Sequence, residues 1–95
     1  MKSILYTIVF VTLFGAGLQA ATITSTAAGG NWSAGSTWVG GVIPSNLGID
    51  DVIIAGPVVQ NTPASVNNLT INPGVNFNRS QLLVIYANFT NNGIM

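Results

Sequence analysis

The sequence has 95 residues, enough for one small domain, and only 4% of them are charged. It contains 2 basic and 2 acidic residues, and neither histidine nor cysteine. These counts exclude a Cys/His zinc site, a thiol nucleophile, a Ser-His-Asp triad and a disulfide framework, and they leave no basic patch for nucleic-acid binding.

Residues 1–20 have the three-part pattern of a secretory signal peptide. Lys2 supplies the positive charge, an apolar run covers Ile4–Leu18, and the small residue Ala20 ends the segment. The pattern predicts cleavage after Ala20, with cleavage after Ala21 as the alternative. A membrane anchor is the competing interpretation, but a spanning helix needs about 20 apolar residues, more than this run supplies. We therefore expect a secreted or cell-surface protein that has no membrane segment after cleavage.

After the leader, the composition becomes polar, uncharged and rich in turn-forming residues. Asn, Gly, Thr and Ser make up 33 of the 75 residues in 21–95. Short clusters of Val and Ile alternate with Asn/Gly turns, which favours many short strands. Because no stretch places apolar residues at helical spacing, the sequence predicts an all-β protein without helices.

The predicted elements fall into two regions. Residues 21–51 are expected to form an N-terminal cap and loop region that begins with a strand at 21–26. Residues 52–95 are expected to form incomplete solenoid coils. The strands predicted in this second region are 52–55, 58–60, 66–72, 75–78 and 82–90. Turn signals such as Asn72-Pro73-Gly74 separate them.

A weak internal repeat with a period of about 20 residues runs through the second region. Asn68-Leu69-Thr70-Ile71-Asn72-Pro73-Gly74 resembles Asn88-Phe89-Thr90-Asn91-Asn92-Gly93. Such a period, with strands and Asn/Gly turns, is typical of a β-solenoid in which stacked coils bury a shared core. We therefore predict the start of a parallel β-helix, with Asn side chains at repeated positions hydrogen-bonding along the stack. A β-sandwich is the alternative.

Three motifs, in this order, resemble a known family. They are Gly30-Asn31-Trp32-Ser33, Ser36-Thr37-Trp38-Val39-Gly40-Gly41-Val42-Ile43-Pro44 and Asp50-Asp51-Val52-Ile53-Ile54. The set resembles the N-terminal part of secreted β-helix modules in surface proteins of Bacteroidetes and is similar to the eight-glycine domain. The resemblance covers Thr22 to the end and implies an extracellular right-handed parallel β-helix. Relatives are generally longer, which implies that this sequence is truncated.

Asp50 and Asp51 are the only acidic residues, and they predict neither a catalytic nor a metal site. Adjacent residues at the start of a strand point to opposite faces, so the two carboxylates do not face one bond as a glycosidase requires. A Ca²⁺ site takes about six to eight oxygen ligands, and no third carboxylate is present. We expect the pair to cap a turn and a strand end, and we predict no catalytic residue, metal or cofactor.

Trp32 and Trp38 have two interpretations. If they are buried, they plug the end of the solenoid, where a cap is needed and large aromatic side chains supply buried area. If they are exposed, they stack on sugar rings, which makes a surface glycan a candidate partner. We expect burial, and keep glycan stacking by Trp32 and Trp38 as the alternative.

The sequence thus predicts a non-enzymatic structural or adhesion-type module of a secreted or cell-surface β-helix protein. The alternative is a fragment of a carbohydrate-binding or polysaccharide-processing β-helix protein whose active residues lie outside this sequence. The last coil is expected to expose an unpaired edge at Leu82–Tyr86, which no charge protects. Its expected partners are further coils of a longer chain or a second copy.

Overall fold

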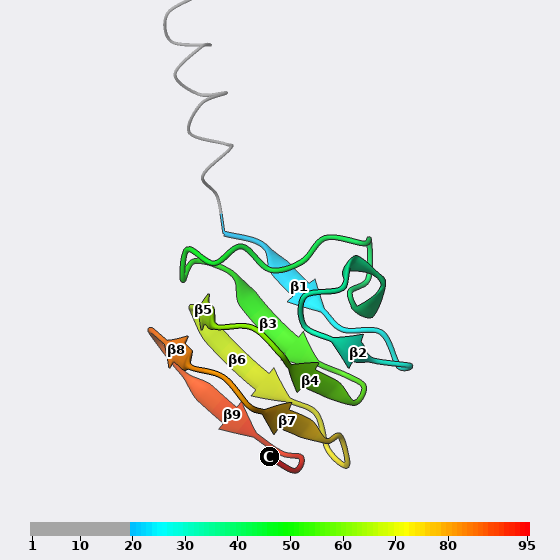
Figure 1. Ribbon diagram of the computed structural model, residues 1–95. Coiled ribbons are helices and arrows are strands. Elements are labelled where there is room, and N and C mark those ends of the chain that lie inside the picture. The colour runs from blue at the N-terminus through cyan, green and yellow to red at the C-terminus, as the bar shows by residue number, and fades with distance from the viewer. Residues whose placement is uncertain (1–19) are drawn as a thin grey trace, which may run out of the picture.

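The computed structural model describes residues 20–95, and the predicted signal peptide lies outside these residues except for Ala20. The described chain contains nine short strands and one 3-10 turn, so the all-β prediction is confirmed (Figure 1). The elements are β1 (Thr22–Thr24), β2 (Gly30–Asn31), the 3-10 turn η1 (Gly35–Thr37), β3 (Asp51–Ile54), β4 (Val58–Gln60), β5 (Ala64–Val66), β6 (Asn68–Ile71), β7 (Phe77–Arg79), β8 (Leu83–Ile85) and β9 (Phe89–Asn91).

The strands form three sheets, with the orders β1-β3-β6-β9, β2-β4-β7 and β5-β8. Every pair of neighbouring strands in these sheets is parallel, whereas the sheets of a β-sandwich are antiparallel. From β3 to β9 the chain visits the three sheets in turn, and each return to a sheet adds a strand beside the previous one (Figure 1). Parallel pairing needs such crossovers, because a tight turn can join only antiparallel neighbours.

The core lies between the three sheets and is built by the alternation of each strand. Ile23, Val52 and Leu69 lie in register across β1, β3 and β6, and all three side chains point inward and are buried. In the same way Val58 lies beside Phe77 in the second sheet. Burying one side chain of this size is worth about 1.5–3 kcal/mol, so stacked apolar columns are the main stabilisation of this nearly uncharged chain.

The two ends of the stack differ. At the first end, the Thr26 N–H donates to the Thr37 carbonyl at 2.8 Å and the Val39 N–H donates to the Thr24 carbonyl at 2.9 Å. Ser25 donates to the Ile53 carbonyl of β3 on its inner side, so residues 37–39 lie against the outer edge of Thr24–Thr26, where β1 ends. They pair there in the antiparallel sense through the bridge between Ser25 and Trp38, so this part of the edge is not free for a further strand. We call this the capped end.

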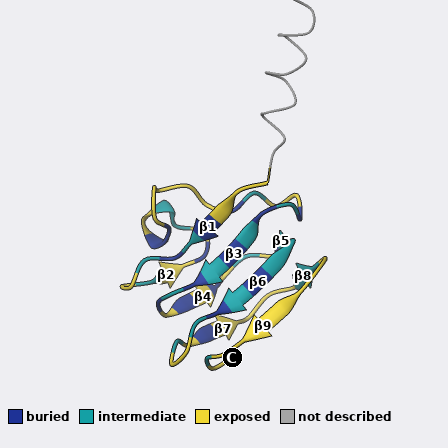
Figure 2. Ribbon diagram, turned by 180° about the vertical axis from the view of Figure 1, so that it is seen from behind, coloured by how far each residue is buried: buried dark blue, intermediate teal, exposed yellow. Residues whose placement is uncertain are grey.

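At the other end, β9, β7 and β8 are the last strands of the three sheets, and we call them the open rung. No described strand pairs with their outer edges, although a single bridge joins Ile94 to Asn76. All three residues of β9 are exposed, whereas β6 beside it alternates half-buried and buried residues (Figure 2).

The region predicted as a cap does more than close the first end. It supplies β1 and β2, which pair with β3 and β4. It also contains the unpredicted 3-10 turn at Gly35–Thr37. A single turn of this kind is too short to produce a helical period in the sequence, so pattern reading cannot detect it.

Candidate functional site

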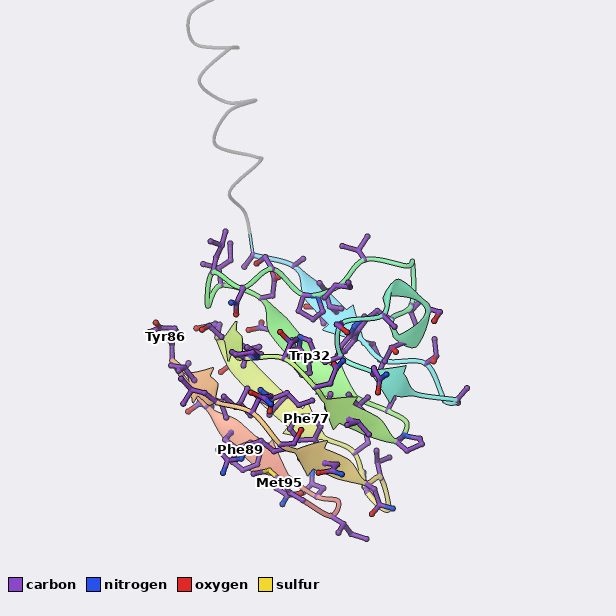
Figure 3. All side chains as sticks on the ribbon, viewed as in Figure 1. Trp32, Phe77, Tyr86, Phe89 and Met95 are labelled. Carbon is purple, nitrogen blue, oxygen red and sulfur yellow. The ribbon has the colours of Figure 1, made fainter. Side chains whose placement is uncertain are left out.

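The two tryptophans lie together in the core. Each is 2% exposed, and their rings meet edge to face with centroids 4.9 Å apart. The Trp38 indole N–H donates to the Trp32 carbonyl at 2.9 Å, and the Trp32 ring packs beside Phe77, whose centroid is 6.1 Å away (Figure 3). Because both indoles are enclosed, neither offers a face to a sugar ring. Glycan stacking by Trp32 and Trp38 therefore does not fit this structure, whereas the buried position does.

Asp50 and Asp51 point in different directions, as expected for neighbours at a strand start. Asp50 is buried, and its carboxylate accepts hydrogen bonds from the Ala21 and Ser45 N–H groups. Asp51 lies on the outer face of the first sheet, where its Oδ1 accepts from the side-chain amides of Asn67 and Asn68. The two carboxylates therefore have separate partners, and neither arrangement assembles a pair of acids around one substrate atom.

The outer face of the four-stranded sheet carries two rows of side chains that are in register. The first row is Thr22, Asp51, Asn68 and Asn88, and the second is Thr24, Ile53, Thr70 and Thr90. In the first row the Asn68 amide donates to Asp51 Oδ1, and Asn68 Oδ1 accepts from the Asn88 N–H, both at 2.9 Å. We call this surface the polar face, and a hollow of about 430 Å³ lies over it.

The polar face explains the repeated Asn-x-Thr pattern of the sequence. In Asn68-Leu69-Thr70 the two polar residues point outward and the middle residue points into the core. The alternation of a strand forces this division, since successive side chains point to opposite faces. The predicted Asn hydrogen bonds along the stack are present, and they link residues 17 and 20 positions apart.

The open rung carries the second candidate surface. Phe89 is its exposed large apolar side chain, Ile94 and Met95 are exposed just after β9, and Leu82 and Tyr86 are exposed on either side of β8. Figure 3 places Phe89 and Met95 at this end of the molecule, whereas the Tyr86 ring lies beside Gly48 in the loop before β3. A hollow of about 500 Å³ lies there against Phe77, Phe89 and Ile94, and Arg79 is the one charged side chain among the described residues that line it.

Two features were not found by sequence reasoning. Gln60 is fully buried, and its amide donates to the Leu82 carbonyl at 2.9 Å, which ties β4 to the open rung. A short apolar patch on the loop after η1 is exposed and comprises Val39, Val42, Ile43 and Leu47. Polar residues are usually exposed and apolar residues usually buried. The sequence therefore predicts neither the burial of Gln60 nor the exposure of these loop residues.

The described residues hold no group of three or more His, Cys, Asp or Glu side chains that is arranged to bind a metal. Within 20–95 there is also no helix with the length and apolar character needed to cross a membrane. Searches against protein-family models, curated proteins and solved structures gave no match, so the family resemblance stays a prediction.

Proposed function

We propose that the protein is a non-catalytic structural module of a secreted or cell-surface protein, and that its three sheets are the faces of a right-handed β-helix whose open rung is covered by another rung. The order in which the chain visits the sheets supports the β-helix, and parallel crossovers are right-handed in about 98% of cases. The leader pattern supports export, and the resemblance to Bacteroidetes surface proteins supports a place at the N-terminal part of a longer protein.

The observation that carries this proposal is the difference between the two ends. Residues 37–39 cover the outer edge at Thr24–Thr26, where β1 ends, whereas β9 is exposed along its length and Phe89 is 44% exposed. An unpaired strand edge is a template for pairing, and clustered exposed apolar side chains mark interaction surfaces. A further rung, supplied by a longer form of the chain or by a second copy, covers both.

The intact mass and the sedimentation of the native secreted product test this proposal. We expect either a product heavier than the 9.8 kDa of the full sequence, or a product with the mass of residues 21–95 that sediments as a dimer or larger. In the second case, Phe89→Lys is expected to weaken association by more than about tenfold, because an unpaired ammonium buried in an interface costs several kcal/mol.

Val42→Lys is the matched control, because Val42 is 62% exposed on the loop after η1 and lies outside the open rung. It is expected to leave association unchanged. A product of 9.8 kDa or less that remains monomeric at high concentration contradicts the proposed role of the open rung. A catalytic turnover that Asp51→Asn abolishes contradicts the non-enzymatic role.

The polar face supports a second candidate function, the binding of an extended polysaccharide. Its rows of donors and acceptors repeat at the strand spacing of about 4.8 Å. The Asn and Asp side chains are fixed by hydrogen bonds, and β-branched Thr side chains have few rotamers, so the array is preorganised. A linear polymer with hydroxyl groups at regular intervals matches such an array. This interpretation moves the carbohydrate site from the tryptophans to the outer face of the sheet.

Retention of the secreted product on insoluble neutral polysaccharides tests the second candidate. Thr70→Val with Thr90→Val removes two hydroxyls and keeps the side-chain shape, and is expected to reduce retention about tenfold. Ser65→Ala, on the outer side of β5, is expected to leave retention unchanged. If the wild-type product is not retained on any of these polymers, the second candidate is wrong.

A further inference from the structure

The backbone of Ala21 lies beside a buried carboxylate. The Ala21 N–H donates to Asp50 Oδ1 at 3.1 Å, and the Ala21 carbonyl accepts from the Asp51 N–H at 2.9 Å. The next residue, Thr22, begins β1 and lies in register with Asp51. Two hydrogen bonds therefore fix Ala21 before the first strand starts.

The carboxylate of Asp50 has no full positive charge among the groups that hold it. Asp50 is 4% exposed, and its second oxygen accepts from the Ser45 N–H at 2.8 Å. Burial raises the pKa of Asp50, but the hydrogen bonds from Ser45 and Ala21 outweigh burial and leave the pKa below its usual value. A negative charge is thus held inside the fold by dipoles, where a cation would stabilise it more strongly.

We propose that Asp50 receives the α-ammonium group formed when the peptide bond between Ala20 and Ala21 is hydrolysed, so that leader removal adds a partly buried ion pair to the fold. Water is the co-reactant: the Ala20 carbonyl carbon becomes a carboxylate, and the Ala21 nitrogen becomes an amine that takes up a proton at neutral pH. Ala20 and Ala21 are both exposed, so the bond is accessible to a processing peptidase. The inference rests on the proposed secretion.

The geometry also separates the two cleavage positions that the sequence leaves open. Cleavage before Ala21 keeps its nitrogen 3.1 Å from Asp50 and turns a neutral donor into a cation. Cleavage after Ala21 removes both hydrogen-bonding groups of that residue. It also leaves Asp50 with only the Ser45 N–H of its two backbone donors. Of the two cleavage positions, hydrolysis of the Ala20–Ala21 bond is therefore the one that keeps the contact with Asp50 and strengthens it.

The ion pair gives stability a defined pH window. The α-amino group is expected to have a pKa above its ordinary value of about 8, so its contribution is complete below that value and is lost as the pH rises through the folded pKa. The lowered pKa of Asp50 acts in the opposite direction: its contribution is present above about pH 4 and is lost as the pH falls through the folded pKa.

Few other charges influence this pair within the described residues. Asp51 is next in the chain, and its carboxylate is bonded to Asn67 and Asn68. Arg79 lies on β7 in a different sheet and lines the hollow at the open rung. The loop before β3 packs against Asp50 through Ser45, which is uncharged.

The absence of lysine after Lys2 makes a specific test practical. The full chain is expressed with its leader in a secreting bacterium, and the exported product is identified by intact mass and N-terminal sequencing. Reductive ¹³C-methylation then labels a single primary amine, the new N-terminus, and its titration is followed by NMR. We expect a product that begins at Ala21, with an α-amino pKa above about 8. Asp50→Asn is expected to return this pKa to its ordinary value.

Asp51→Asn is the matched control, because it removes the same charge one residue away and is expected to leave the α-amino pKa raised. A product that retains the leader contradicts the proposed secretion itself. A product that begins at Ala21 with an ordinary α-amino pKa overturns the role of Asp50 but agrees with secretion. A product that begins at Thr22 also overturns the role of Asp50 and also agrees with secretion. If Asp50→Asn does not fold, the titration of the wild-type product alone decides.

Discussion

Replacing Trp38 with alanine is expected to lower the free energy of unfolding by about 3–5 kcal/mol. The side chain is 2% exposed, and it fills the interior beside Trp32 at a ring distance of 4.9 Å. Its indole N–H also satisfies the Trp32 carbonyl, which would be left without this donor. Since small domains have a total stability of only about 5–15 kcal/mol, this one change removes much of what holds the fold together.

Urea unfolding of the secreted product, followed by far-UV circular dichroism, measures this effect. Val39→Ala changes the neighbouring residue, which is 64% exposed, and is expected to alter stability by less than about 0.5 kcal/mol. Trp38→Phe is expected to lie between the two, because it keeps an aromatic ring and loses the hydrogen bond. A Trp38→Ala loss no larger than that of Val39→Ala would show that the tryptophan pair does not stabilise the core.

Gly29→Ala is expected to destabilise the protein by about 2–5 kcal/mol in total. Gly29 has a φ of +68°, where a side chain costs about 1–2 kcal/mol. The added Cβ would also overlap the carbonyl oxygen of Pro57, which accepts the Gly30 N–H at 2.9 Å. Relieving this overlap requires the two stacked turns to separate, and overpacking of this kind adds about 1–3 kcal/mol.

Gly74→Ala provides a control with nearly the same backbone conformation. Gly74 has a φ of +73°, and an added Cβ meets no atom within 4 Å. Its expected cost is the conformational part alone, about 1–2 kcal/mol. The difference between the two unfolding free energies therefore measures the contact between the turns. Equal losses for Gly29→Ala and Gly74→Ala would mean that the turns tolerate separation.

The period-two pattern was enough to predict the all-β class, and the repeat of about 20 residues predicted the parallel sheets. Leu69 and Ile71 point inward, and Asn68 and Thr70 point outward, as alternation requires. The pattern does not determine where each strand begins and ends, because turns with Asn and Gly differ in length from one return to the next. The residues paired across the sheets are thus 17 positions apart at Asp51 and Asn68, and 20 apart at Asn68 and Asn88.

The candidate sites were less predictable because they depend on contacts between distant residues. The Trp32 ring packs beside Phe77 of β7, which lies 45 positions later in the sequence. No local motif contains both residues, so the sequence pattern does not predict this contact. Asp50 similarly gains its partner from Ala21, 29 positions earlier. The sequence indicates that the side chains of Asp50 and Asp51 point in different directions, and their hydrogen bonds go to separate partners. It cannot indicate that one of them is buried beside the first residue of the predicted mature chain.

The hydrogen bonds of residues 37–39 on β1 have a consequence for how such a chain lengthens during evolution. A duplicated coil inserted before β1 finds the Thr24 carbonyl and the Thr26 N–H already occupied. A coil added after β9 finds an unpaired parallel edge whose Asn and Thr residues continue the existing rows. An added parallel strand would therefore find free partners beside β9, whereas at Thr24–Thr26 it would have to displace residues 37–39.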